Sequence, residues 1–308
     1  MIRKSNTTTR RDFLQTTAAL ITASLGASAF VFKKKEPLLA FSTLGCPDWS
    51  LTQIVDFAAK HGFKGIEVRG LMREMNLTQC KEFSKQNLAT SLRLLQDKGL
   101  EFVNLGASAT LHFAEGNERE KNLDEGKRYI DLAQELKCPY MRVFPNNFPK
   151  DQDKNKTMDL ISKGLLELGN HAKGGNVVVL VESHGDLIYV NDLQQVLKAS
   201  EHEHVGLIWD IANMWTVTKE SPAMAYEKLK KYIRHTHIKN AKLSNDKLTY
   251  TRLAQGDVPI FEAIDALSKG GYKGYYSFEW EKLWHPELEA PELAIADYAV
   301  VMKKHFQQ

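Results

Sequence analysis

The chain has 308 residues, with 41 lysines and arginines, 38 aspartates and glutamates, and only three cysteines. Residues 1–35 hold seven of the basic residues and one acidic residue, so the rest of the chain carries a small acidic excess. This balance argues against nucleic acid as the main partner, because duplex-binding proteins need a basic excess to neutralise phosphates. Cys46, Cys80 and Cys138 are far apart and include no CxxC pair, so neither a disulfide framework nor a zinc finger is expected.

Residues 1–35 have the pattern of an export signal followed by a short linker. Arg10 and Arg11 precede a stretch of small and apolar residues that runs to Phe32. The paired arginines resemble a twin-arginine signal, which implies the twin-arginine export machinery as a partner and a periplasmic or otherwise exported protein. An ordinary secretory signal and an uncleaved membrane anchor are the alternatives, since the apolar stretch is close to the shortest length that spans a bilayer.

Replacing Arg10 and Arg11 together with lysine is expected to block export, because the twin-arginine machinery reads the arginine pair itself. Cell fractionation with detection of the chain in the periplasm measures the effect. Normal periplasmic appearance of the double variant would show that another route carries the protein.

Eight short apolar runs follow this segment, and each has the length and composition of a buried parallel strand. Such strands are apolar along their whole length because both faces of a parallel sheet are covered. The runs span residues 38–43, 65–69, 101–106, 140–144, 177–182, 206–210, 234–239 and 275–280.

Helical patterns separate the eight runs. Ser50 precedes one helical pattern and Ser221-Pro222 precedes another, and both are typical starts of helices. Gly62 follows the first pattern and is a typical end of a helix. The segments "HGFKGIEV" and "GGYKGYYSFE" repeat one connection between a helix and the next strand.

This alternation of strand and helix predicts an α/β fold, the (β/α)₈ TIM barrel, formed as one domain by residues 36–308. An open, doubly wound sheet is the alternative. No strand run is followed by the GxGxxG turn of a dinucleotide-binding sheet, so the barrel is favoured.

Metal-binding side chains occur where four successive strand runs end, and the active site of such a barrel lies at that rim. Glu182, Asp210 and Glu279 stand at or near the ends of three runs, and the run between the last two carries His235 and His237 on one face. Three carboxylates and one imidazole are mostly hard donors, which favour one divalent ion, Mn²⁺, Mg²⁺ or Co²⁺, with Zn²⁺ also acceptable.

Each of these residues has an alternative structural role. An aspartate at a strand end often caps the next helix, and Glu279 alone fits a surface ion pair. A single His-x-His pair is also a weak motif. Four such residues at one rim, most of them between apolar neighbours, need a compensating charge, which a metal ion would supply.

The segments "VESHGD", "LIWDIAN", "HTHIKN" and "SFEWE" resemble the strand ends of the xylose isomerase-like barrels, a family of sugar isomerases and epimerases. The segment "AQGDVP" resembles the glycine-containing loop of that family. In the family the histidine directly before the apolar-Lys-Asn/Asp triplet is the ligand, so the resemblance implies Glu182, Asp210, His237 and Glu279 as the ligand set. His235 then packs one pleat deeper. The chain departs from the family at Asn213, where many members have histidine.

The resemblance implies an isomerase or epimerase that acts on a small-molecule sugar. Such a reaction needs a base to remove a proton next to a carbonyl and an acid to return it. Glu182 and Glu279, on the fifth and eighth strands, are the expected acid and base. An exported enzyme would meet unphosphorylated sugars or their derivatives, so these are the expected substrates.

Seven further residues are predicted to bind the substrate. Four polar residues at or just past strand ends are candidates for binding hydroxyl groups, although structural ion pairs or solvated positions are equally open for them. Three tryptophans in predicted loops are candidates for covering the apolar face of a sugar, or else for packing against the loops. The seven are Glu67, Arg142, His184, Lys239, Trp49, Trp215 and Trp284.

Other functions share this pattern of strand ends. Lyases or dehydratases that act on keto-sugars and 3-keto-glycosides use the same proton-abstraction step and then expel a leaving group. The DNA-repair endonucleases of the superfamily need more histidine ligands and a basic groove, and a non-catalytic sugar-binding barrel would not need the second carboxylate. The sequence leaves the oligomeric state open, a homo-oligomer included.

Overall fold

The computed structural model describes residues 36–244 and 247–307, and the predicted export signal lies outside these residues. Eight parallel strands form a closed barrel, in which neighbours along the chain are neighbours in the sheet and the last strand pairs with the first. This confirms the predicted (β/α)₈ TIM barrel. Its strands are β1 (Leu39–Ser42), β2 (Gly65–Val68), β3 (Glu101–Thr110), β4 (Tyr140–Phe144), β5 (Val178–Glu182), β6 (Val205–Asp210), β7 (Ile233–Ile238) and β10 (Tyr276–Phe278).

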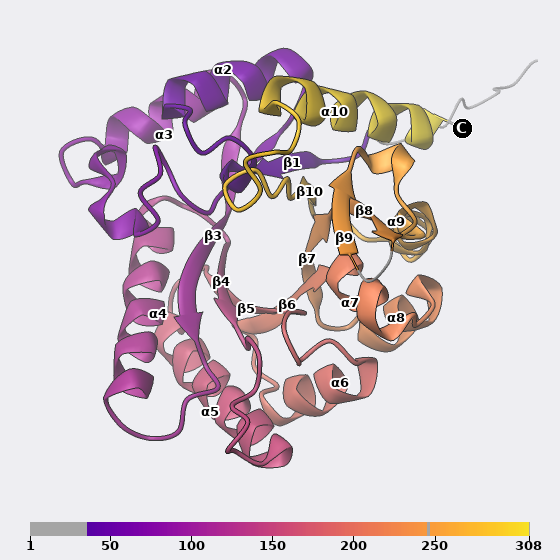
Figure 1. Ribbon diagram of the computed structural model, residues 1–308. Helices are drawn as coiled ribbons and strands as arrows, with labels where there is room; N and C mark the ends of the chain where they lie inside the picture. Colours follow the sequence, from indigo (N-terminus) through magenta and orange to yellow (C-terminus); the bar gives the residue numbers. More distant parts are fainter. Residues whose placement is uncertain (1–35, 245–246, 308) are drawn as a thin grey trace, which may run out of the picture. The chain divides into compact units, whose positions relative to one another are not determined.

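The helices lie outside the ring of strands and follow them in chain order (Figure 1). Single 3₁₀ turns at Thr43–Gly45, Leu77–Gln79, Lys81–Phe83 and Leu253–Gln255 complete the connections. The helices are α2 (Leu51–His61), α3 (Leu88–Gln96), α4 (Asn117–Glu135), α5 (Lys154–Ala172), α6 (Val190–Ala199), α7 (Ile211–Thr218), α8 (Pro222–Leu229), α9 (Ile260–Lys269) and α10 (Pro291–Gln307).

The ends of α2 are formed by the residues that the sequence marks for them. The Ser50 side chain accepts a hydrogen bond from the backbone N–H of Gln53, and the Gln53 side chain accepts one from the backbone of Ser50. Gly62 ends the helix with φ of 77°, in the left-handed region that glycine adopts without a steric penalty. The helix α8 begins at Pro222, as predicted.

Strand residues alternate between the helix layer and the barrel interior. Trp209 of β6 is buried and stacks on Tyr226 of α8, so it points away from the interior as its position in the strand predicts. Ala40, Val103 and Tyr275 form a small, separate apolar cluster. Most of the other inward positions near the carboxyl ends of the strands are polar and buried, which is unusual for a core and marks the region of a site.

Two predicted boundaries were wrong. The strand β3 continues to Thr110, four residues past the predicted run. Residues 240–244 and 247–251, expected as parts of a loop, form the antiparallel pair β8 (Asn240–Ser244) and β9 (Lys247–Thr251) after β7. Many side chains of this hairpin are polar and exposed, so its sequence lacks the apolar run that identified the barrel strands.

Cys46, Cys80 and Cys138 are buried and free. Among residues 36–244 and 247–307, none of the helices combines the length and the apolar character that crossing a membrane requires.

Candidate functional site

The structure brings Glu182, Asp210, His237 and Glu279 together at one rim of the barrel. One donor atom of each residue lies within 4.8 Å of a donor atom of every other. The Nδ1 atom of His237 lies 3.3 Å from Oε1 of Glu182 and 3.3 Å from Oε1 of Glu279. All four side chains are buried. The strand ends thus deliver the four residues to one place, as the spacing along the chain predicts.

Asp210 has two roles that the sequence analysis treated as alternatives. Its Oδ1 accepts a hydrogen bond of 2.9 Å from the backbone N–H of Asn213 and so caps α7. Its Oδ2 lies 3.8 Å from Nδ1 of His237. The helix cap therefore holds the carboxylate in the orientation that directs its second oxygen into the site.

Lys239 lies inside this group rather than in solvent. It is only 2% exposed, and its Nζ is 2.8 Å from Oδ2 of Asp210 and 2.6 Å from Oε2 of Glu279. Glu281, which the sequence analysis missed, is a third partner at 2.8 Å. The alternative of a solvated loop residue was wrong, because three carboxylates compensate the buried ammonium. They raise the pKa of Lys239 well above its ordinary value, although burial alone would lower it.

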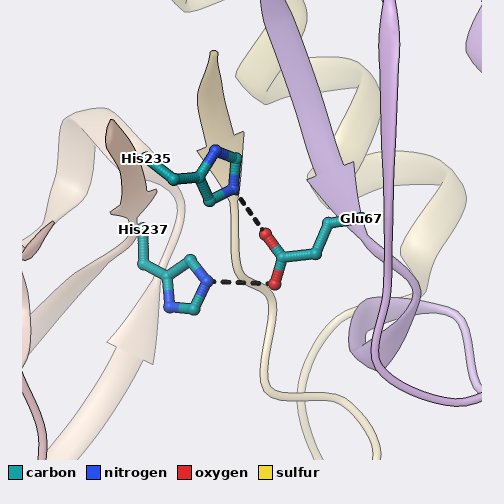
Figure 2. Close-up of side chains that lie close together, drawn as sticks. All are labelled: Glu67, His235 and His237. Carbon is teal, nitrogen blue, oxygen red and sulfur yellow. Dashed lines mark hydrogen bonds and ion pairs between the residues drawn. The ribbon is translucent and has the colours of Figure 1, made fainter. Parts of the chain in front are cut away.

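Glu67 was predicted to bind a substrate hydroxyl, and the structure gives it a different place. Nε2 of His235 donates to one carboxylate oxygen at 2.8 Å and Nε2 of His237 donates to the other at 3.0 Å. Ser277 adds a hydrogen bond of 2.9 Å from its hydroxyl. Figure 2 shows the carboxylate of Glu67 facing both imidazoles, with one oxygen directed at each. Both oxygens of Glu67 are thus bonded inside the barrel, and its contact with a substrate hydroxyl stays a prediction.

This contact sets the orientation of His237. Since Nε2 carries the proton donated to Glu67, Nδ1 is the ring nitrogen left to face the carboxylates of the site. His235 lies one pleat deeper, donates to Glu67 and packs edge-on against the ring of His237, with centroids 6.0 Å apart, which agrees with its expected packed position. Glu67 therefore has a positioning role for the candidate ligand His237.

Replacing Glu67 with glutamine is expected to weaken Mn²⁺ or Co²⁺ binding by roughly 10- to 100-fold, the usual effect of losing an outer partner of a metal-bound histidine. Competition with a fluorescent chelator measures the affinity. Ser277→Ala is the matched variant, because it removes one hydrogen bond from Glu67 and leaves both imidazole bonds in place. A smaller loss is expected for it, and equal affinity in the wild type and Glu67→Gln would contradict the positioning role.

The two candidate catalytic carboxylates differ in their electrostatic surroundings. Burial raises the pKa of Glu279 to about 8, although the charges of His237 and Lys239 oppose this shift. Burial would raise the pKa of Glu182 as well, but the charges of His237 and Arg142 outweigh it and hold that pKa below its ordinary value. Two carboxylates with separated pKa values are typical of an acid and base pair.

Arg142 and His184 lie beside Glu182. The Nη1 atom of Arg142 is 3.3 Å from Oε2 of Glu182, and its guanidinium lies 3.5 Å above the ring of Phe144. The ring of His184 packs against the same phenyl ring, with centroids 4.7 Å apart, and its buried Nδ1 has no hydrogen-bond partner among the described residues. Arg142 thus has the ion-pair role that the sequence analysis left open, and His184 retains a free polar atom.

The three tryptophans have different surroundings from one another. Trp215 was predicted to lie in a loop, which was wrong: it belongs to α7, and the ammonium of Lys219 one turn later lies 3.8 Å from its ring. Trp49 packs against Phe57 of α2, with centroids 4.9 Å apart. Trp284 is 56% exposed. Contact of these rings with a sugar stays a prediction.

The four converging residues fit a divalent cation. Oε2 of Glu182 and Oδ2 of Asp210 are buried and form no hydrogen bond among the described residues; their contacts are ion pairs with Arg142 at 3.3 Å and with Lys239 at 2.8 Å. Three carboxylates and one imidazole nitrogen form the donor set that Mg²⁺, Mn²⁺ and Co²⁺ accept. The residues that would hold the ion are therefore Glu182, Asp210, His237 and Glu279.

Comparison with known proteins connects this barrel to a family. A profile described as "Xylose isomerase-like TIM barrel" matches residues 55–303. A 3-dehydroshikimate dehydratase of Bacillus anthracis is 24% identical over 229 residues, which are 70% of this chain and 78% of that protein.

Solved structures share the fold at low sequence identity. A xylose isomerase-like TIM barrel protein from Mycobacterium smegmatis, in complex with magnesium, superposes with a TM-score of 0.67 at 20% identity, over 88% of this chain and 97% of that chain. The 3-keto-D-glucoside 4-epimerase YcjR from E. coli superposes with a TM-score of 0.70 at 15% identity, over 87% and 100% of the two chains.

Proposed function

The chain belongs to the xylose isomerase-like TIM barrel family, and from this membership we propose that it is a metal-dependent enzyme acting on a small hydroxylated carbonyl compound. It removes a proton from the carbon next to the carbonyl. The observation that carries this proposal is the convergence of Glu182, Asp210, His237 and Glu279 on one point of the barrel rim.

Glu182 and Glu279 divide the proton transfer between them. Glu182, whose pKa is held low, is ionised near neutral pH and takes the proton from the substrate carbon. Glu279 lies on the other side of the group and is the partner that returns the proton to the substrate. When bound by Glu182, Asp210, His237 and Glu279, a divalent cation would supply stabilisation of the negative charge that develops on the substrate oxygens.

The first candidate outcome is isomerisation or epimerisation of a sugar. In both reactions the proton returns to carbon, either to the neighbouring atom or to the opposite face of the same atom. Carboxylates at the ends of β5 and β10 suit this outcome, because β6 and β7 separate these strands in the barrel and the two groups approach a substrate from different directions. An epimerase with the same fold supports it.

Elimination of water is the second candidate, and the similarity to the 3-dehydroshikimate dehydratase favours it. The first proton transfer is the same. The electron pair left on carbon then forms a double bond as the neighbouring hydroxyl leaves, and an acid of the site protonates that hydroxyl to water.

The twin-arginine pattern of residues 1–35 leads us to place this reaction outside the cytoplasm, on unphosphorylated sugars or their derivatives. The proposal for the location depends on the sequence pattern alone.

Incubation of the protein with keto-sugars and keto-glycosides in D₂O with Mn²⁺ or Mg²⁺ tests the common step. Deuterium is expected at the carbon next to the carbonyl, detected by NMR and mass spectrometry. Epimerised or isomerised product would select the first candidate, and release of water or an alcohol would select the second. Bound metal without exchange in any of the compounds would contradict the proton-abstraction mechanism.

A further inference from the structure

Two arginines lie side by side on the inner face of β2 to β4, next to the candidate metal site. Arg69 follows β2 and Arg142 belongs to β4, and Gly106 of β3 pairs with Arg142 in the sheet. A Cβ atom on Gly106 would lie 2.7 Å from Cδ of Arg69 and 2.8 Å from Nη2 of Arg142. Because Gly106 has no side chain, both arginine side chains can lie close to its Cα atom on the inner surface of the barrel.

The charges of these arginines are only partly compensated. Arg69 is 7% exposed and donates only to neutral oxygens, Gly106 O at 3.4 Å and Ser108 Oγ at 3.0 Å. Within residues 36–244 and 247–307, no carboxylate lies within 4.0 Å of its guanidinium. Arg142 is 1% exposed, and its Nε and Nη1 atoms have no hydrogen-bond partner among the same residues, although Glu182 lies 3.3 Å away. Buried cations are normally paired and fully bonded.

Both guanidiniums act on the active site and on each other. Burial lowers the pKa of Arg69 to about 10, and the charge of Arg142 adds to this shift. The charges of Glu182 and Glu279 oppose this lowering of the pKa, so Arg69 is close enough to interact electrostatically with the candidate catalytic carboxylates. At neutral pH Arg69 keeps its charge. An anion placed between two such guanidiniums would remove their repulsion and fill their free donor positions.

We propose that Arg69 and Arg142 bind an oxyanion of the substrate, a carboxylate or a phosphate. The guanidinium fork matches either group, and hydrogen bonds from Arg to these anions are among the strongest in proteins. This inference rests on the proposed function for the position of the reacting carbon. Anchored on the side of β2 and β4, the substrate extends its carbonyl toward the carboxylates of β5, β6 and β10. An unphosphorylated substrate makes a sugar acid the expected source of the anion.

Calorimetric titration in the presence of Mg²⁺, at constant ionic strength, tests the inference with three probes. These are 2-keto-D-gluconate, which carries a carboxylate, D-fructose 6-phosphate, and neutral D-fructose. One of the two anionic probes is expected to bind roughly 10- to 100-fold more tightly than D-fructose, the effect of one or two charge-assisted hydrogen bonds. The tighter of the two identifies the anion. Binding of both anions no tighter than D-fructose would overturn the inference.

Arg69→Gln is expected to remove this preference for the anionic probe over D-fructose. Arg73→Gln is the matched control, because Arg73 is a nearby arginine whose exposed side chain pairs with Asp48. If Arg69→Gln and Arg73→Gln bind the preferred anionic probe with equal affinity, the inference is also overturned. Should Arg69→Gln fail to fold, the comparison of probes on the wild type still decides the question.

These titrations measure binding and need no turnover. If the protein prefers an anion but catalyses no deuterium exchange, the anion subsite is retained and the proposed reaction is rejected. If it catalyses exchange but shows no preference for an anion, the reaction is retained and the subsite is rejected.

Discussion

Glu182→Gln is expected to slow deuterium exchange next to the substrate carbonyl by about 10²- to 10⁴-fold, the usual effect of losing a general base. Glutamine keeps the shape of the side chain and a neutral oxygen for a metal ion, but it has no carboxylate to accept the proton. The exchange rate in D₂O, measured at saturating metal for the variant and the wild type, gives the effect.

Metal content must be measured on the same samples, because Glu182 is also a candidate ligand. The control is Glu227→Gln, which makes the same chemical change at an exposed residue paired with Lys230. It should exchange at the wild-type rate. A metal-loaded Glu182→Gln protein with unchanged exchange would show that another group removes the proton.

His237→Ala is expected to lose bound metal, while His235→Ala keeps most of it. His237 supplies the only nitrogen donor of the group, and its Nδ1 faces the carboxylates of Glu182 and Glu279. Among the acidic residues that the structure describes, His235 hydrogen-bonds only to Glu67. Loss of a ligand should exceed the roughly 10- to 100-fold effect typical of an outer partner.

Metal content after dialysis, measured by elemental analysis, compares the two histidine variants directly. Both replace a buried imidazole on the same strand with the same residue, so each is the control for the structural cost of the other. Equal metal loss in both would show that the two histidines cannot be separated into a ligand and a packed residue.

The strands and the rim of the barrel could be predicted because their signals are local. Each run of apolar residues identifies its own strand, and a carboxylate such as Glu182 or Asp210 at the end of a run must lie at the same rim as the others. This geometric rule leads to a metal site at the rim, and the family resemblance then selects His237 rather than His235 as its histidine.

The contacts across the interior could not be predicted from the same signals. Glu67 reaches His235 and His237 because strand stagger and side-chain length bring β2 and β7 within hydrogen-bond distance, and neither is visible in a run of residues. Burial of Lys239 likewise depends on Glu281, which lies beyond a strand end. A binding role for Arg69 was not predicted, because its side chain lies next to Gly106 only through the alignment of three neighbouring strands.

Diffraction from crystals of the protein grown with Mn²⁺, at a wavelength where manganese scatters anomalously, tests the central claim most directly. The account predicts one anomalous peak bonded to carboxylate oxygens of Glu182, Asp210 and Glu279 and to Nδ1 of His237, at about 2.0 to 2.3 Å. A peak elsewhere, or none at this rim while Lys239 stays bonded to Asp210 and Glu279, would contradict it.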